Sequence, residues 1–188
     1  YNGNPNLQPE EAETTDIGFE YTVGDSVLDF VYFTTDLKNL ITYANSTYSN
    51  GSGTSNRHGA EMKFNSLISD NVYWRNSATF TVAEDGNGTR VTRRPKWMGL
   101  TAIDHKKDSW TNTVEYLHTG SHLDIDSVTY ARTMKPAVGV VNLHTSKVVN
   151  DKSNVVLSVN NAFDKTYDRP DGYAQHGRNI LFTYKLQF

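Results

Sequence analysis

The sequence of 188 residues contains no cysteine, which excludes disulfide bonds and metal sites built from thiolates. It has no run approaching the roughly 20 consecutive apolar residues that a membrane-spanning helix requires. Basic residues gather only around residues 90–96 and the net charge is −3, so a nucleic-acid partner is not expected. Phosphate-binding loops, recognisable catalytic carboxylate pairs and Ser/His/Asp arrangements are missing as well. We therefore expect neither an enzyme nor a protein with a resident cofactor or metal.

The C-terminal residues 177–188 show the clearest pattern in the sequence, because apolar and polar side chains alternate up to the last residue. One face of the predicted strand carries Ile180, Phe182, Tyr184, Leu186 and Phe188. The other face is polar apart from Leu181. Period-two alternation places the two sets on opposite sides of a β-strand. A terminal strand with one uncovered apolar face is typical of an outer-membrane β-barrel, in which lipid covers the outer face.

Alternation of the same kind predicts nine strands and no helix longer than a turn. The predicted strands are residues 13–23, 27–43, 55–68, 72–83, 92–105, 109–119, 137–148, 154–163 and 177–188. Their lengths of roughly ten to seventeen residues exceed those usual in soluble proteins and suit strands that cross a bilayer at a tilt. We therefore predict an all-β fold, an antiparallel up-and-down transmembrane β-barrel. A soluble β-sandwich is the alternative, because its strands alternate in the same way.

The connections between these strands alternate between short and long. Short turns are predicted at residues 24–26, 69–71, 106–108 and 149–153, and long connections at 44–54, 84–91, 120–136 and 164–176. Bacterial outer-membrane barrels have short periplasmic turns and long extracellular loops, so we place the long connections outside the cell. Such barrels have an even number of strands, whereas nine is odd. The chain also begins at Tyr1 rather than at a methionine, and we expect residues 1–188 to be the C-terminal part of a larger barrel.

Four segments, in this order, resemble the C-terminal barrel portion of TonB-dependent outer-membrane receptors. They are N-P-N-L-Q-P-E at residues 4–10, F-T-T-D-L-K-N-L-I at 33–41, V-N-N-A-F-D-K-T-Y at 159–167, and the ending with Gly172-Tyr173, Gly177-Arg178 and the terminal strand. The resemblance covers nearly the whole chain, and Ala162 replaces the usual leucine of the third segment. It implies a barrel of about 22 strands in the outer membrane of a Gram-negative cell, of which this chain would supply the last strands.

The resemblance also implies a function, which is active import of a bulky nutrient across the outer membrane. An N-terminal plug domain, absent from residues 1–188, would fill the lumen and meet the TonB–ExbB–ExbD complex. The cargo would be a small-molecule metal chelate, first a ferric siderophore or another iron complex, then haem or cobalamin. A passive porin-like channel and a soluble β-sandwich binding module are the alternatives. Tyr184, Leu186 and Phe188 match the terminal signal that the barrel-assembly machinery reads.

A cluster of cations at an external strand start is the first candidate for ligand binding. Its members are Arg57, Arg90, Arg93 and Arg94. Cations in this position would attract an anionic ferric chelate, or bind the phosphates of lipopolysaccharide in the outer-membrane lipid. The alternative is a solvated rim without a ligand.

Aromatic and imidazole side chains in the long connections are the second group of candidates. Tyr48, Tyr130 and Tyr173 would stack on a bulky ligand or belong to the aromatic girdle at the membrane interface. His122 and His176 would be axial ligands if the cargo were haem, and are otherwise solvated loop histidines.

Two further groups in the connections are expected to be structural or silent. Asp124 and Asp126 are too few carboxylates to argue for a Ca²⁺ site. In residues 160–165, the Asn and Asp side chains are expected to fix the backbone where a strand leaves the bilayer, with Phe163 packing at the rim.

Overall fold

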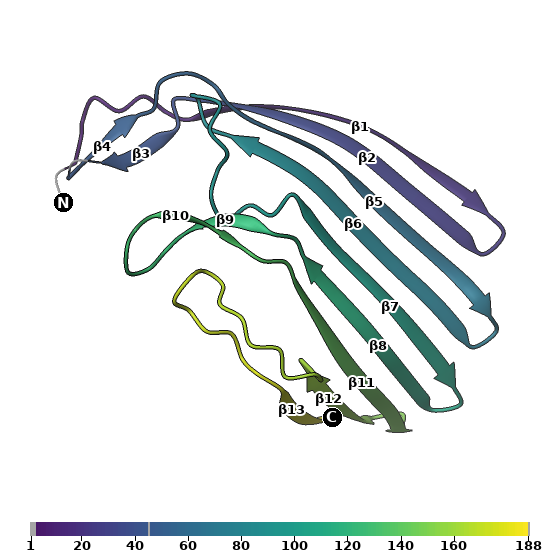
Figure 1. Ribbon diagram of the computed structural model, residues 1–188. Helices are drawn as coiled ribbons and strands as arrows, with labels where there is room; N and C mark the ends of the chain where they lie inside the picture. The colour runs from purple at the N-terminus through teal and green to yellow at the C-terminus, as the bar shows by residue number, and fades with distance from the viewer. Residues whose placement is uncertain (1–2, 45, 188) are drawn as a thin grey trace.

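The fold is one antiparallel sheet with two small hairpins at one end (Figure 1). The computed structural model describes residues 3–44 and 46–187. In spatial order the sheet contains β1 (Glu11–Val23), β2 (Ser26–Lys38), β5 (Ser55–Ser69), β6 (Val72–Glu84), β7 (Trp97–Lys107), β8 (Trp110–Thr119), β11 (Val138–Asn150), β12 (Ser153–Asn160) and β13 (Asn179–Leu186). The hairpins are β3 (Ile41–Ala44) with β4 (Thr47–Asn50), and β9 (His122–Ile125) with β10 (Arg132–Lys135). Within the described ranges, no helix is long and apolar enough to cross a membrane.

The nine strands of the sheet confirm the nine strands predicted from alternation, and the differences lie at strand ends. Asn39 and Asn161 have φ angles of 57° and 51°, a left-handed conformation that does not fit a strand. For this reason β2 and β12 end earlier than predicted. Arg93 likewise has a φ angle of 61°, and β7 begins at Trp97 rather than at residue 92. Residues 41–43, predicted as the end of the strand 27–43, belong instead to the separate strand β3, and β4, β9 and β10 lie in connections for which no strand was predicted.

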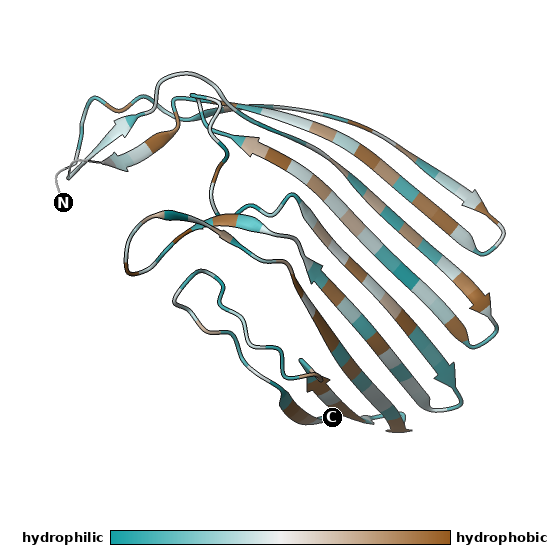
Figure 2. Cartoon of the chain, in the orientation of Figure 1, coloured by the Kyte–Doolittle hydropathy of each residue, from teal (hydrophilic) through white to brown (hydrophobic). Residues whose placement is uncertain are grey.

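Apolar and polar residues alternate along the strands of the sheet (Figure 2), and the register of cross-strand pairing places the predicted apolar residues on one face. One row of paired residues is Ile17, Tyr32, Ala60, Phe80 and Trp97, and the next is Phe19, Phe30, Met62, Ala78 and Gly99. The row that follows on the opposite face is Glu20, Asp29, Lys63, Ser77 and Leu100. We call these two sides the apolar face and the polar face. The alternation of the sequence therefore corresponds to a single consistent register across the sheet.

Within residues 3–44 and 46–187, no second layer covers the apolar face. Ile17, Phe19 and Ile180 expose 71%, 56% and 69% of their surface. Among the described residues, only Phe33 and Ala102 are buried apolar side chains. The sheet is a curved wall that ends at β1 on one side and at β13 on the other (Figure 1). A β-sandwich buries one face of each sheet against the other, so the structure contradicts the sandwich alternative.

Short and long connections lie at opposite ends of the sheet, as predicted (Figure 1). Two-residue turns join β1 to β2, β5 to β6, β7 to β8 and β11 to β12. Gly24 and Asp108 adopt positive φ angles of 54° and 53° in two of these turns, which a tight hairpin reversal requires. The long connections gather at the other end together with both hairpins. We call the two ends the short-turn end and the long-loop end.

The N-P-N-L-Q-P-E segment has a structural role, because its polar groups hold the connection that follows β2. The backbone N–H of Ile41 donates a hydrogen bond to Glu10 Oε1 at 2.7 Å. Asn50 Nδ2 donates to the carbonyl oxygens of Gln8 and Asn39, at 2.9 and 2.7 Å. These contacts fix hairpin β3–β4 against the start of β1.

Candidate ligand site at the long-loop end

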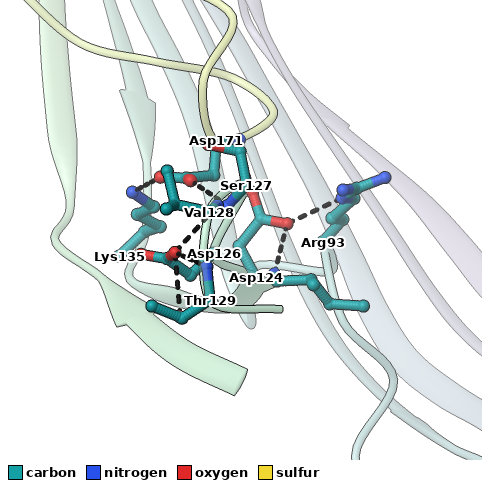
Figure 3. Close-up of polar contacts among 9 residues, drawn as sticks. Arg93, Asp124, Asp126, Ser127, Val128, Thr129, Lys135 and Asp171 are labelled. Atoms are coloured by element: carbon teal, nitrogen blue, oxygen red, sulfur yellow. Dashed lines mark hydrogen bonds and ion pairs between the residues drawn. The ribbon is translucent and has the colours of Figure 1, made fainter. Parts of the chain in front are cut away.

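A buried carboxylate joins three long connections at the long-loop end. The side chain of Asp124 on β9 is fully buried. Its Oδ1 accepts hydrogen bonds from Arg93 Nε and from the N–H of Ile125, both at 2.7 Å (Figure 3). Its Oδ2 accepts the N–H of Asp171 at 2.9 Å. The connection before β7, hairpin β9–β10 and the connection after β12 therefore meet at one carboxyl group.

The side chain of Asp171 adds further contacts with the segment from Ser127 to Lys135. Asp171 Oδ2 accepts the N–H of Ser127 at 2.7 Å, and its Oδ1 is ion-paired with Lys135 Nζ (Figure 3). Gly172 has a φ angle of 78°, and a Cβ atom there would lie 2.7 Å from Ser127 Oγ. Both facts explain why a glycine stands in the Gly-Tyr part of the C-terminal ending. We call Arg93, Asp124, Ser127, Lys135 and Asp171 the loop junction.

The two carboxylates of hairpin β9–β10 are held ionised by different partners. Burial alone would raise the pKa of Asp124, but the hydrogen bonds from Arg93 and Ile125 outweigh it and lower that pKa below its usual value. The backbone N–H and hydroxyl of Thr129 lower the pKa of Asp126, which is half-buried in a local turn. Within residues 3–44 and 46–187, no group of three or more His, Cys, Asp or Glu side chains could hold a metal ion.

The connection between β12 and β13, residues 161–178, is fixed by the polar side chains expected to fix it. Asn161 is 4% exposed, and its Nδ2 donates to the carbonyl oxygens of Lys165 and His176 at 2.8 and 3.2 Å. The carboxylate of Asp164 lies close to Gly177, where a Cβ atom would be 2.6 Å from Oδ1. A side chain at position 177 would therefore displace this carboxylate, which accepts the N–H of Arg178 at 2.7 Å.

A cavity of about 450 Å³ opens where this connection meets the polar face. Its lining includes the side chains of Arg57, Arg93, Arg94, Arg169 and Glu61. Four cations against one carboxylate give the cavity a positive balance, and the protein walls around it strengthen the field of these charges. The guanidinium of Arg57 also lies 5.2 Å from the centre of the Phe33 ring, which gives it a fixed place. We call this space the cationic cavity.

A second cavity, of about 420 Å³, lies beside the first on the polar face. Its lining includes Asn142, Tyr167 and His176, and also Arg169. Arg169 Nη1 donates a hydrogen bond to Thr119 Oγ1 at 3.2 Å, at the end of β8. Arg169 thus lies at the border of both cavities. We call this second space the amide cavity.

The structure brings together three of the four arginines predicted to act together. Arg57, Arg93 and Arg94 line the cationic cavity, from β5 and from the connection before β7. Arg90 is not among the residues that line it, and its carbonyl oxygen accepts a hydrogen bond from Arg132. Ligand binding by all four residues stays a prediction.

The two histidines predicted as loop residues have different environments. His122 is only 6% exposed and its Nδ1 lies 3.2 Å from the carbonyl oxygen of Gly120, so the expectation that it is solvated is wrong. Its position in hairpin β9–β10, beside the loop junction, is the reason for its burial. His176 is exposed and lines the amide cavity. Their role as axial ligands stays a prediction.

The predicted aromatic residues do not gather at one place. The ring of Tyr48 lies 4.9 Å from that of Tyr43 within hairpin β3–β4. Tyr130 and Tyr173 expose 79% and 68% of their surface. Phe163, expected to pack at the rim, exposes 80% of its surface, because residues 161–178 fold toward the polar face and leave its ring outside. The tyrosines remain ligand candidates by prediction only.

The predicted terminal signal lies partly within the described residues. Tyr184 pairs with Val155 across β12 and β13, and Leu186 pairs with Ser153. Tyr184 and Leu186 belong to the apolar face, as the alternation predicted. Phe188 lies outside the described residues.

Sequence reasoning missed Arg169, Lys135 and Asp171. Alternation carries no information for these three residues, because they lie outside the nine strands of the sheet. The available signal was the Gly172-Tyr173 motif, which stands directly after Asp171. This motif resembles a family feature, but it does not indicate which residues bind the carboxylate of Asp171.

The single-layer sheet, with an exposed apolar face and a polar face that carries cavities, defines the wall of a transmembrane β-barrel. The chain belongs to the family described as TonB dependent receptor-like, beta-barrel, whose model matches residues 1–162. It is 27% identical over 194 residues to the vitamin B12 transporter BtuB of Vibrio cholerae, an alignment that covers 99% of this chain and 31% of BtuB. The chain thus spans about a third of the length of the curated relatives it matches.

Solved structures of similar fold agree with this assignment. The ferripyoverdine receptor of the outer membrane of Pseudomonas aeruginosa superposes with a TM-score of 0.79 at 18% identity, over 97% of this chain and 28% of the receptor. The copper transporter OprC superposes with a TM-score of 0.83 at 14% identity, over 98% of this chain and 31% of OprC. The predicted family, the barrel fold and the outer-membrane location are therefore confirmed. The short-turn end is periplasmic, the long-loop end extracellular, the apolar face meets lipid and the polar face meets the lumen.

Proposed function

We propose that residues 1–188 are the C-terminal part of the barrel of a TonB-dependent receptor that imports a bulky nutrient, most simply an anionic ferric chelate such as a siderophore. The observation that carries the proposal is the cationic cavity, where Arg57, Arg94 and Arg169 face the lumen near its extracellular mouth. Positive charge in a confined, low-dielectric mouth attracts and concentrates an anionic ligand. Haem and cobalamin are the other candidates for the cargo.

Energy coupling would require parts that lie outside residues 1–188. A plug domain would close the lumen and transmit force from the TonB–ExbB–ExbD complex. The ligand would then be released because its affinity differs between the closed and open states of the plug. Assembly into the membrane would use Tyr184, Leu186 and Phe188 as the signal for the barrel-assembly machinery. The cations of the rim would also be available to lipopolysaccharide. The family match favours this receptor over a passive porin-like channel, and it gives no reason to assign an enzymatic activity.

Growth of a strain that lacks the gene tests the function directly. The strain is supplied with single sources of iron or cobalt, which are ferric siderophores of different charge, haem and cobalamin. We expect loss of growth on one anionic ferric chelate and recovery with the wild-type gene. Recovery should weaken when the gene carries Arg57→Gln together with Arg94→Gln. Normal growth of the deletion strain on every source would contradict the import of a metal chelate.

A further inference from the structure

We propose that Arg169 is a specificity-determining residue that selects anionic ligands, and that Asp124 is the positioning residue that holds Arg169 in the lumen. The proposal rests on the proposed function, because it names the residue through which that site would choose its ligand. Arg169 is shared by the cationic cavity and the amide cavity, because it lines both of them.

The position of Arg169 suits contact with a ligand. Its guanidinium reaches the polar face at Thr119, while the residue as a whole stays exposed. Within the described part of the chain, Arg169 makes no ion pair, whereas the charge of Arg93 is already engaged by Asp124. A guanidinium with one neutral hydrogen-bond partner keeps most of its donors for an incoming anion.

The charges around Arg169 favour an anion of high charge. On the side of the cationic cavity stand Arg57, Arg93 and Arg94 with Glu61 as the acidic residue. On the side of the amide cavity the lining holds amides, a tyrosine and a histidine, and no carboxylate. A ligand that reaches from one cavity into the other would therefore meet cations and neutral donors, with Arg169 at the centre.

The backbone around Arg169 is a turn that is closed by hydrogen bonds among its own residues. The N–H of Arg169 donates to the carbonyl oxygen of Tyr173 at 3.0 Å, and Gln175 Nε2 donates to the carbonyl oxygen of Arg169 at 2.8 Å. The N–H of Gln175 in turn donates to the carbonyl oxygen of Tyr167 at 3.0 Å. Asp171 belongs to the same turn, so an anchor at Asp171 fixes the position of Arg169.

Asp124 supplies that anchor. Its buried carboxylate accepts the N–H of Asp171, and the cation and the amide that bind its other oxygen keep it ionised (Figure 3). Hydrogen bonds to a buried charged acceptor are stronger than those to a neutral one. Asp124 is thus joined to Arg169 through the turn, although it lines neither of the two cavities.

The test uses the full-length receptor that contains this segment, purified in detergent, and two probes that differ in charge. The probes are a hexadentate ferric tris-catecholate, which is trianionic, and a hexadentate ferric tris-hydroxamate, which is neutral. Arg169→Gln should weaken binding of the trianionic probe about tenfold and leave the neutral probe unchanged, because one charge-assisted contact is lost. It should also flatten the dependence of trianionic binding on salt. Arg169→Lys should retain part of the preference.

The positioning role is tested by combining variants. Asp124→Asn should weaken trianionic binding, and in the Arg169→Gln background it should have no further effect. Asp126→Asn on the same hairpin is the matched control and should leave both probes unaffected. Equal binding of the trianionic probe by wild type and Arg169→Gln would overturn the specificity role alone. Additive losses in the double variant would overturn the positioning role. Failure of the wild-type receptor to prefer the trianionic probe would overturn both, together with the anionic-chelate part of the proposed function.

Discussion

The sheet and the long-loop end differ in where their side chains find partners. Every residue of β1 is exposed, and the large apolar residues of β13 are exposed as well. At the long-loop end, by contrast, Asp124 is 0% exposed and Asn161 is 4% exposed. Between its two edge strands, β1 and β13, the sheet satisfies its backbone by strand pairing, and its side chains are left to lipid and lumen. The loops bury polar side chains against one another.

This difference shows which part of the structure depends on its surroundings. The apolar face gains its stabilisation from the membrane, since no protein layer covers it among the described residues. The loop junction gains its stabilisation from contacts within the chain, such as the ion pair of Arg93 with Asp124. Changes to the sheet should therefore act through the lipid, and changes to the loops through local hydrogen bonds.

The largest expected effect comes from placing a charge on each face of the sheet in turn. Met62→Arg puts a cation on the lipid-facing side of β5 and should cost about 2–4 kcal/mol of unfolding free energy near the bilayer midplane. Thr79→Arg puts the same side chain on the lumenal side, where Thr79 pairs with Glu61, and should cost much less. Urea unfolding of the full-length receptor in liposomes measures both. Equal losses would contradict the assignment of the faces.

The next largest effect concerns two glycines that differ in the space around them. A Cβ atom on Gly59 would lie 2.0 Å from the carbonyl oxygen of Phe80 and 2.8 Å from the ring of Phe33. A Cβ atom on Gly99 would lie 3.4 Å from its nearest neighbour, the carbonyl oxygen of Ser77. Gly59→Ala should therefore cost about 1–3 kcal/mol, and Gly99→Ala should be close to neutral. The same unfolding measurement compares them, and a neutral Gly59→Ala would show that the wall has more room than the structure indicates.

The sheet could be predicted from the sequence because the alternation of apolar and polar residues can be read within each single strand. Lipid on one face and water on the other impose a period of two. The face on which residues such as Ile180 and Phe182 lie can therefore be predicted without knowing which strands lie beside them. Strand ends were predicted less well, because a left-handed residue such as Asn161 can end a strand whatever its pattern. The order of the strands followed from the alternation of short and long connections.

The candidate site could be predicted only in part, because its contacts join distant residues. The arginine cluster was visible since Arg93 and Arg94 are adjacent in the sequence. The partner of Arg93 is 31 residues away, and the N–H that binds Asp124 Oδ2 is 47 residues away. No local pattern encodes such pairs. For the same reason Arg169 was missed and His122 was expected to be solvated.

A smaller effect separates the two carboxylates of hairpin β9–β10. Asp124→Asn should weaken the bond to the N–H of Asp171 by about 1 kcal/mol, which is roughly a fivefold faster hydrogen exchange of that amide. Asp126→Asn should speed exchange at Val128 and Thr129 and leave Asp171 unchanged. Residue-resolved hydrogen exchange of the receptor in detergent provides the comparison. Equal acceleration at Asp171 in both variants would contradict the central place of Asp124.

The smallest expected effect is the loss of the Asp124 charge in acid, which should lower the protection of the Asp171 amide. Its pKa is lower in the folded protein than the usual value of 3.8, because Arg93 and Ile125 bind the ionised form. The ionised carboxylate therefore stabilises the folded loops fully above that usual value, and the contribution is lost as the pH falls through the lower, folded value. The protection factor of the Asp171 amide should be constant between about pH 8 and pH 5 and should fall only in stronger acid. In Asp124→Asn this fall should disappear, because the carboxylate that binds the Asp171 amide is replaced by an amide that does not titrate in this range. A protection factor that already falls between about pH 7 and pH 5 would contradict the assignment of this pH dependence to Asp124.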